Sequence, residues 1–208
     1  MGGGTPLTYR TSVRSILLVV AATLLLVGCG ERREEQPPRA ADVPTTPASL
    51  AYIAAEYLGE PDYATPDSNW SSSFGPRPLE ASLWFGSDGQ YDGDHVVMIV
   101  GRATDGIADC SDLVRYIDGC EELEDGLWYW GEAIPEEDPG SVHIVRRKGK
   151  VTVRLAYYGP AIEGDPREQN LPIDVQTLID LAADPRLDKT TDQDVVEQAA
   201  KAAYWRGS

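Results

Sequence analysis

Alternating apolar and polar residues predict β-structure in the middle of the chain. In residues 151–158 (VTVRLAYY) the first, third, fifth and seventh side chains are apolar or aromatic, as in a strand with one buried face. Other short apolar segments predict four more strands, at residues 83–85, 95–100, 127–134 and 142–147. Turn-forming residues cluster between neighbouring segments, so we expect an antiparallel β-meander.

Helical spacing of apolar residues flanks this region on both sides. Apolar side chains recur every three or four positions in residues 50–58, with Ser49 as the expected N-cap and Gly59 as the residue that ends the helix. Two C-terminal helices are expected, at 175–183 capped by Asp174 and at about 192–204 capped by Thr191. Strands in the middle and helices at both ends predict an α+β fold, with one sheet packed by three helices.

Length and composition fit one globular domain with appendages. The chain has 208 residues, of which 42% are hydrophobic and 25% charged. It carries 34 Asp and Glu against 18 Lys and Arg, a formal charge of -16. This balance argues against a nucleic-acid partner, because phosphate backbones are bound by clustered positive charge.

The first 28 residues have the pattern of a secretory signal peptide. Arg10 and Arg14 precede a mainly apolar segment, residues 16–27, that is too short for a stable membrane-spanning helix. The segment ends in Leu-Val-Gly-Cys at positions 26–29, which resembles the lipobox of bacterial lipoproteins. The resemblance implies acylation of Cys29 and lipid anchoring at the extracytoplasmic face of the cell membrane. The alternative is an ordinary signal peptide that ends near a cysteine.

A change in composition follows Cys29. Residues 30–48 contain four prolines and seven charged residues but no aromatic residue, which is typical of a segment that cannot form a core. We therefore expect three parts: a signal peptide at 1–28, the lipidated Cys29 with a disordered tether at 29–48, and a single extracytoplasmic domain at 49–208.

The other two cysteines, Cys110 and Cys120, are expected to form a disulfide. Disulfides persist in the oxidising space that a lipoprotein faces. The alternative is a redox-active pair, but the C-x-x-C spacing is absent and neighbouring acidic residues disfavour a thiolate.

Charge is distributed in blocks. Residues 109–138 contain eleven acidic residues and one cation, and the next hairpin reverses the sign. Its cations are Arg146, Arg147, Lys148 and Lys150. They are candidates for contact with anionic headgroups or wall polymers. The alternative is that they protect a sheet edge against aggregation.

Three further motifs have a structural and a functional interpretation. Trp128 and Trp130 share one face of a strand, where they either fill the core or form a sugar-stacking platform. Asp88, Asp92 and Asp94 resemble part of a calcium loop, but Ile99 occupies the position of the bidentate Glu. We therefore expect a polar turn and no metal site there.

No catalytic motif is present in the expected mature chain. His95 and His143 are possible bases, and Ser87 and Ser141 possible nucleophiles, but no spacing selects them. We expect no cofactor. The leading hypothesis is a non-catalytic binding or structural role in the cell envelope, with an envelope protein or wall polymer as partner. The alternative is an extracytoplasmic hydrolase that uses acidic residues and His95.

Three short phrases resemble a group of secreted lipoproteins of actinobacteria that have no assigned function. They are Pro-Glu-Glu-Asp-Pro-Gly at 135–140, Tyr-Tyr-Gly-Pro-Ala-Ile at 157–162 and Gly-Asp-Pro-Arg at 164–167. The similarity would cover about residues 105–190. It implies the same compartment and brings no catalytic residue with it.

Overall fold

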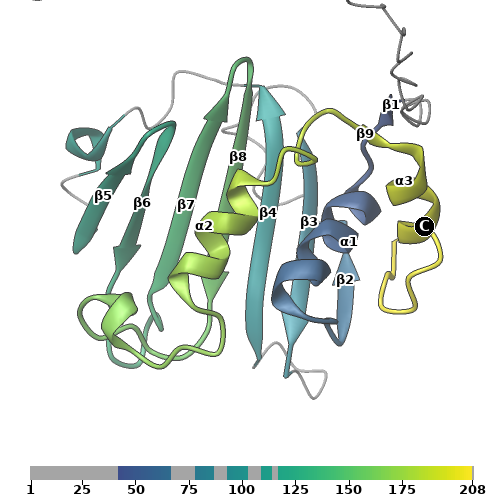
Figure 1. Cartoon of the computed structure of the whole chain (residues 1–208). Helices are drawn as coiled ribbons and strands as arrows, with labels where there is room; N and C mark the ends of the chain where they lie inside the picture. Colours follow the sequence, from purple (N-terminus) through teal and green to yellow (C-terminus); the bar gives the residue numbers. More distant parts are fainter. Residues whose placement is uncertain (1–41, 67–77, 87–92, 103–108, 114–116, 208) are drawn as a thin grey trace, which may run out of the picture. The chain divides into compact units, whose positions relative to one another are not determined.

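An antiparallel sheet of seven strands forms the centre of the computed structural model, which describes residues 42–66, 78–86, 93–102, 109–113 and 117–207 (Figure 1). The strands are β2 (Tyr63–Thr65), β3 (Leu79–Phe85), β4 (Asp94–Arg102), β5 (Gly119–Leu123), β6 (Gly126–Gly131), β7 (Ser141–Lys148) and β8 (Val151–Tyr158). Their spatial order is β2-β3-β4-β8-β7-β6-β5. The chain therefore crosses once, from β4 to the outer strand β5, and returns as a meander whose last strand pairs with β4.

Helices cover one face of this sheet. They are α1 (Pro47–Leu58), α2 (Val175–Ala183) and α3 (Gln193–Ala199), with short 3-10 helices η2 (Cys110–Asp112) and η3 (Pro166–Glu168). Figure 1 shows α1 and α2 on the same face, and α3 packs against α1. A second, two-stranded sheet pairs β1 (Asp42–Pro44) with β9 (Thr190–Asp192). The expected α+β class, with a meander and three helices, is confirmed. None of the helices in the described ranges has both the length and the apolar composition needed to cross a bilayer.

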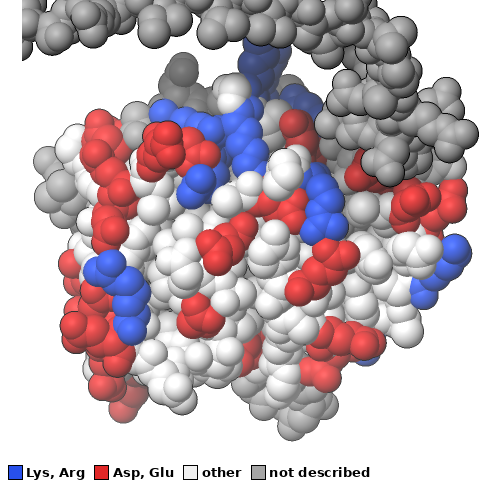
Figure 2. Space-filling model, in the orientation of Figure 1, with Lys and Arg blue, Asp and Glu red and all other residues white. Residues whose placement is uncertain are grey.

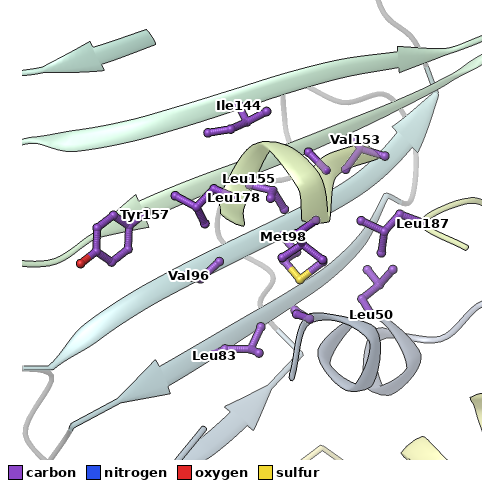
Figure 3. Packing of buried hydrophobic residues seen from close by; sticks show 14 of the residues in the cluster. Leu50, Leu83, Val96, Met98, Ile144, Val153, Leu155, Tyr157, Leu178 and Leu187 are labelled. Carbon is purple, nitrogen blue, oxygen red and sulfur yellow. The ribbon is translucent and has the colours of Figure 1, made fainter. Parts of the chain in front are cut away.

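The main core lies between the sheet and the helices (Figure 3). Val153, Leu155 and Tyr157 of β8 are fully buried there, which confirms the alternation seen in the sequence. They meet Leu178 of α2, and Leu50 of α1 packs into the same cluster. Full burial of one such side chain stabilises a fold by about 1.5–3 kcal/mol, so this face supplies most of the hydrophobic stabilisation.

The opposite face of the sheet carries two small apolar clusters. Val97, Ile99 and Ala156 form a small buried cluster at its centre. Beside it, Leu113 follows η2 and packs on Leu127 and Val145. The segment that contains Cys110 thus covers part of the second face.

Ordered structure begins before the expected boundary at Ser49. Residues 42–48 were expected in the tether, yet they form β1 and the start of α1. The N-cap is Thr46, and Ser49 is the third helical residue: its amide donates to Thr46 Oγ1 at 3.1 Å, and the Thr46 amide donates to Ser49 Oγ at 3.4 Å. This reciprocal capping moves the helix start by three residues. Residues 1–28, Cys29 and the rest of the expected tether lie outside the described residues.

Of the two helices expected near the C-terminus, one begins where the sequence predicts and the other does not. Asp174 caps α2, as expected: its carboxylate accepts from the Thr177 amide at 2.9 Å. Thr191 does not cap the next helix, because it lies buried in β9, and α3 begins after Asp192. The expectation of a helix from 192 to about 204 was wrong in extent, since α3 ends at Ala199.

Candidate functional site

The disulfide ties η2 to the outer strand of the sheet. Cys110 and Cys120 are bonded, with their Cα atoms 5.7 Å apart, which confirms the predicted pair. Cys120 lies in β5 opposite Tyr129 of β6. The bond therefore holds η2, and Leu113 after it, against the second face of the sheet.

A row of stacked rings crosses this second face. Tyr63 of β2 stacks on Trp84 of β3 with ring centroids 5.8 Å apart, and Trp84 stacks on His95 of β4 at 3.5 Å. His95 in turn stacks on Tyr158 of β8 at 5.9 Å. The register aligns Tyr63, Trp84, His95 and Tyr158 side by side across four strands. Because each ring covers the face of its neighbour, the row does not offer flat ring faces to a ligand.

A polar cluster continues this row into β7 and β6. The His143 ring stacks on Tyr129 at 4.6 Å between centroids. Arg154 of β8 donates to Tyr129 Oη at 3.0 Å, and its guanidinium lies 3.3 Å from His143 Nδ1. On the other side of the imidazole, Ser141 Oγ lies 2.9 Å from Nε2. Cross-strand pairing places Tyr129 opposite His143, and the alternation of β8 puts Arg154 on the same face.

The hydrogen-bond donors in this cluster fix the role of His143. A guanidinium has only donors, so Nδ1 must accept from Arg154, and the ring proton is assigned to Nε2, which donates to Ser141 Oγ. Burial, followed by the charge of Arg154, lowers the pKa of His143 to about 3, so the ring is neutral near pH 7. An activated serine needs the opposite polarity, with histidine accepting the hydroxyl proton. Ser141 and His143 are thus adjacent but not arranged as a nucleophile and its base.

His95, the base of the alternative hydrolase, and the neighbouring carboxylate Asp94 point in different directions. His95 belongs to the ring row on the second face, whereas Asp94 points to the helix face and accepts from Tyr157 Oη at 2.7 Å. Successive residues of a strand face opposite sides, so Asp94 and His95 do not converge. The hollow beside Asp94 has a volume of about 320 Å³ and is lined by Phe85, Gly86, Gly93, Asp94, Gly159 and Pro160.

The remaining catalytic and metal candidates fall largely outside the described residues. This applies to Ser87, and to Asp88 and Asp92 of the expected polar turn. Within the described ranges, no group of three or more His, Cys, Asp or Glu side chains is placed to hold a metal ion.

Trp128 and Trp130 stack on each other with centroids 4.8 Å apart. Trp128 is 1% exposed and belongs to the main core, and the guanidinium of Arg167 lies 4.9 Å above its ring. Trp130 is half-buried against the same core. This arrangement favours the core-packing interpretation over the sugar platform, since a sugar cannot reach a buried indole.

The four cations of the β7-β8 hairpin have different surroundings. Arg146 forms an ion pair with Asp125, with Nε and Oδ1 2.5 Å apart, and is largely buried. Lys148 donates from Nζ to the backbone carbonyl of Asp184 at the end of α2, and burial lowers its pKa. Arg147 is half-buried, and Lys150 is exposed. The structure therefore brings the four residues together, and Arg146 and Lys148 contact partners within the domain.

Two Asp-Pro-Arg turns have the same geometry, which the repeated tripeptide could have indicated. Asp184 Oδ1 accepts from the amide of Arg186 at 2.8 Å, and Arg186 NH2 pairs with Asp184 Oδ2 at 2.7 Å. Asp165 and Arg167 repeat both contacts, at 2.9 and 2.7 Å. Each arginine then reaches a glutamate of another element: Glu56 of α1 for Arg186 and Glu121 of β5 for Arg167.

Comparison with known proteins gave no match: no protein-family model, curated protein or solved structure is significantly similar to this chain.

Proposed function

We propose that this chain is a lipid-anchored extracytoplasmic protein with a non-catalytic binding or structural role in the cell envelope. The observation that carries the proposal is the distribution of its three cysteines. Cys110 and Cys120 are bonded to each other, so Cys29 is the cysteine that remains for acylation. Cys29 also stands at the end of Leu-Val-Gly-Cys, directly after the apolar segment of the expected signal peptide.

The disulfide supports an extracytoplasmic location. Stable disulfides are rare in a reducing cytosol and frequent in secreted domains. A single acyl chain binds a membrane only marginally, with an association constant of roughly 10⁴ M⁻¹, whereas two or more chains anchor a protein stably. The proposal therefore includes a diacylglyceryl group on the Cys29 thiol.

The polar cluster on the second face supports a non-catalytic role. His143 donates to Ser141 and accepts from Arg154, so both ring nitrogens are engaged in holding the cluster together. The proposed partner is an envelope protein or a wall polymer. A hydrolase that combines His95 with Asp94 receives no support, since these side chains lie on opposite faces of the sheet.

Metabolic labelling with an alkyne fatty acid in a bacterial host that processes lipoproteins tests the proposal. The wild-type chain should carry the label and stay with washed membranes, whereas Cys29→Ser should lose both properties. The double variant Cys110→Ser/Cys120→Ser is the matched control, because it removes cysteines outside the lipobox and should still be labelled. Equal labelling of Cys29→Ser and wild type would contradict the proposal.

A further inference from the structure

Exposed cations gather at one end of the seven-stranded sheet. Arg102, the last residue of β4, pairs across the sheet with Val151, the first residue of β8. Lys150 precedes Val151 in the two-residue turn after β7. This pairing makes Arg102 and Lys150 neighbours at this end, and both are exposed. In Figure 2, blue side chains gather in the upper part of the molecule, around the same end of the domain.

The N-terminal side of the chain joins the domain at this same end. Lys148 Nζ donates to the carbonyl of Asp184, and the Thr45 amide donates to the carbonyl of Lys189 at 3.0 Å. Residues 184–189 thus run from the hairpin tip to the start of the domain. Figure 1 shows β1, β9 and the β7-β8 turn at the upper end of the sheet. Lys189 is exposed and adds a third cation there.

The other end of the sheet is acidic. β4 begins there, β6 and β8 end there, and the loops that follow carry carboxylates. These are Glu132, Glu136, Glu137, Asp138 and Glu163, and Asp94 begins β4 at the same end. Exposed cations therefore concentrate at the first end, where the acidic residues Glu122, Glu124 and Asp125 at the β5-β6 turn lie beside Arg146 and Arg147.

We propose that the end formed by Arg102, Lys150 and Lys189 lies against the anionic phospholipid headgroups of the bilayer in which Cys29 is anchored. The inference rests on the proposed lipid anchor and adds the surface and orientation of the domain. The proposed contact surface differs from the one expected from the sequence. Arg146 and Lys148 are left out because they have partners within the domain, and Arg102 and Lys189 are added.

Chain length and charge both favour this occupant. Twelve residues separate Cys29 from Asp42, and the chain from the anchor spans at most roughly 45 Å when fully extended. The end of the domain that carries Asp42 is therefore within reach of the bilayer. Anionic headgroups attract near-surface Lys and Arg and repel the acidic far end.

Some acidic residues oppose the contact. Asp42 and Asp192 face each other across β1 and β9, and Asp188 precedes Lys189. They lie on the β1-β9 side, and Glu122, Glu124 and Asp125 lie at the β5-β6 turn beside the hairpin. Arg102 ends β4 and Lys150 precedes β8, at the centre of the sheet. At physiological ionic strength the Debye length is about 8 Å, so charges beyond that distance are largely screened.

Lysine acetylation on vesicles tests the orientation. Residues 29–208 contain four lysines: Lys148, Lys150, Lys189 and Lys201. With the disulfide intact, Cys29 is the remaining thiol and can be coupled to a maleimide lipid. This coupling supplies the anchor chemically, so failure of acylation in cells does not affect the result. Mass spectrometry then gives the acetylation rate of each lysine on phosphatidylcholine vesicles with and without phosphatidylglycerol.

The expected result is selective protection. On anionic vesicles, Lys150 and Lys189 should be acetylated at about one third of their rate on neutral vesicles, or more slowly still. The acetylation rate of Lys201, after α3, should not change. Salt at 1 M, where the Debye length is about 3 Å, should abolish the difference. Arg102→Gln should weaken the protection of Lys150, whereas Arg206→Gln, which removes an exposed cation above Tyr63, should not.

Two results would overturn the inference. The first is equal protection of Lys150 and Lys201, or equal rates on the two vesicle types, with the disulfide and circular dichroism unchanged. The second is protection by soluble polyphosphate in the absence of any protection by anionic vesicles. That outcome would assign the surface to an anionic polymer instead of the bilayer.

Discussion

The guanidinium of Arg154 lies 3.3 Å from His143 Nδ1 and fixes the tautomer of a buried histidine. The two residues lie on adjacent strands, and Arg154 also donates a hydrogen bond to Tyr129. Any proton added to His143 must displace this contact and put two positive charges side by side. The cluster is therefore a structural device that depends on a neutral imidazole.

This gives a prediction for pH. Burial and Arg154 lower the pKa of His143 to about 3, below the unfolded value of about 6.5, so the unfolded chain binds the proton more tightly between these values. The contribution of neutral His143 to the free energy of unfolding is complete above about pH 6.5. It decreases as the pH falls, by up to about 1.4 kcal/mol per pH unit. The free energy of unfolding of His143→Gln, measured with urea, should depend less on pH than that of the wild type between pH 6 and pH 4, a range that lies roughly between the two pKa values. Identical pH dependence of the variant and wild type would contradict the prediction.

The twin Asp-Pro-Arg turns allow a matched comparison of two aspartates. Burial opposes ionisation of Asp184, but its hydrogen bonds from Arg186 and Tyr57 keep its pKa below the usual range. Asp184→Asn leaves Arg186 without its main partner and should lower the free energy of unfolding by about 3 kcal/mol or more. Asp165→Asn changes the same turn at a more exposed site and should cost about 1 kcal/mol or less. Equal losses in denaturant titration would show that burial of Asp184 is not the deciding factor.

The disulfide closes a short loop over the second face. Cys110 and Cys120 are ten positions apart, and the entropy of such a loop in the unfolded chain predicts about 2–3 kcal/mol of stabilisation. Cys110→Ser/Cys120→Ser should lose this amount in guanidinium unfolding, and reducing agent should have no further effect on the variant. A variant as stable as the oxidised wild type would mean that the bond adds nothing to η2 packing.

Two glycines of β6 provide a test of strand packing. A Cβ built at Gly126 would lie 1.9 Å from the carbonyl oxygen of Val145, so the backbone of β7 would have to move. At Gly131 the nearest atom is 4.0 Å away. Gly126→Ala should therefore destabilise the domain by about 2 kcal/mol or more, and Gly131→Ala by less than about 1 kcal/mol. Thermal unfolding of the two variants checks the difference, and a reversed order would contradict the packing of β6 on β7.

Local sequence was sufficient where one element determines its own ends. The alternation in residues 151–158 gave the bounds of β8, and Asp174 marked the start of α2. Local sequence was insufficient where pairing with a distant segment determines the secondary structure. Thr191 looks like a helix cap, but β9 uses it to pair with Val43 of β1, almost 150 residues away.

The candidate sites show the same contrast. The Cys110–Cys120 pair followed from cysteine number and compartment. The contact of His143 with Arg154 and the stacking of His95 on Trp84 depend on cross-strand register, which short apolar segments do not specify. The opposite orientations of Asp94 and His95 required only the alternation of a strand, a signal already present in the sequence.

The separate pairing of β1 with β9 has a mechanical consequence. A pulling force that reaches the domain from its N-terminal side acts first on Asp42–Pro44, whose strand partner is β9. The two strands form a sheet of their own, outside the seven-stranded sheet. Peeling β1 away would therefore lengthen the linkage before tension reached Leu50 and the core behind it. Under such a load, the β1-β9 pair would extend before the rest of the domain.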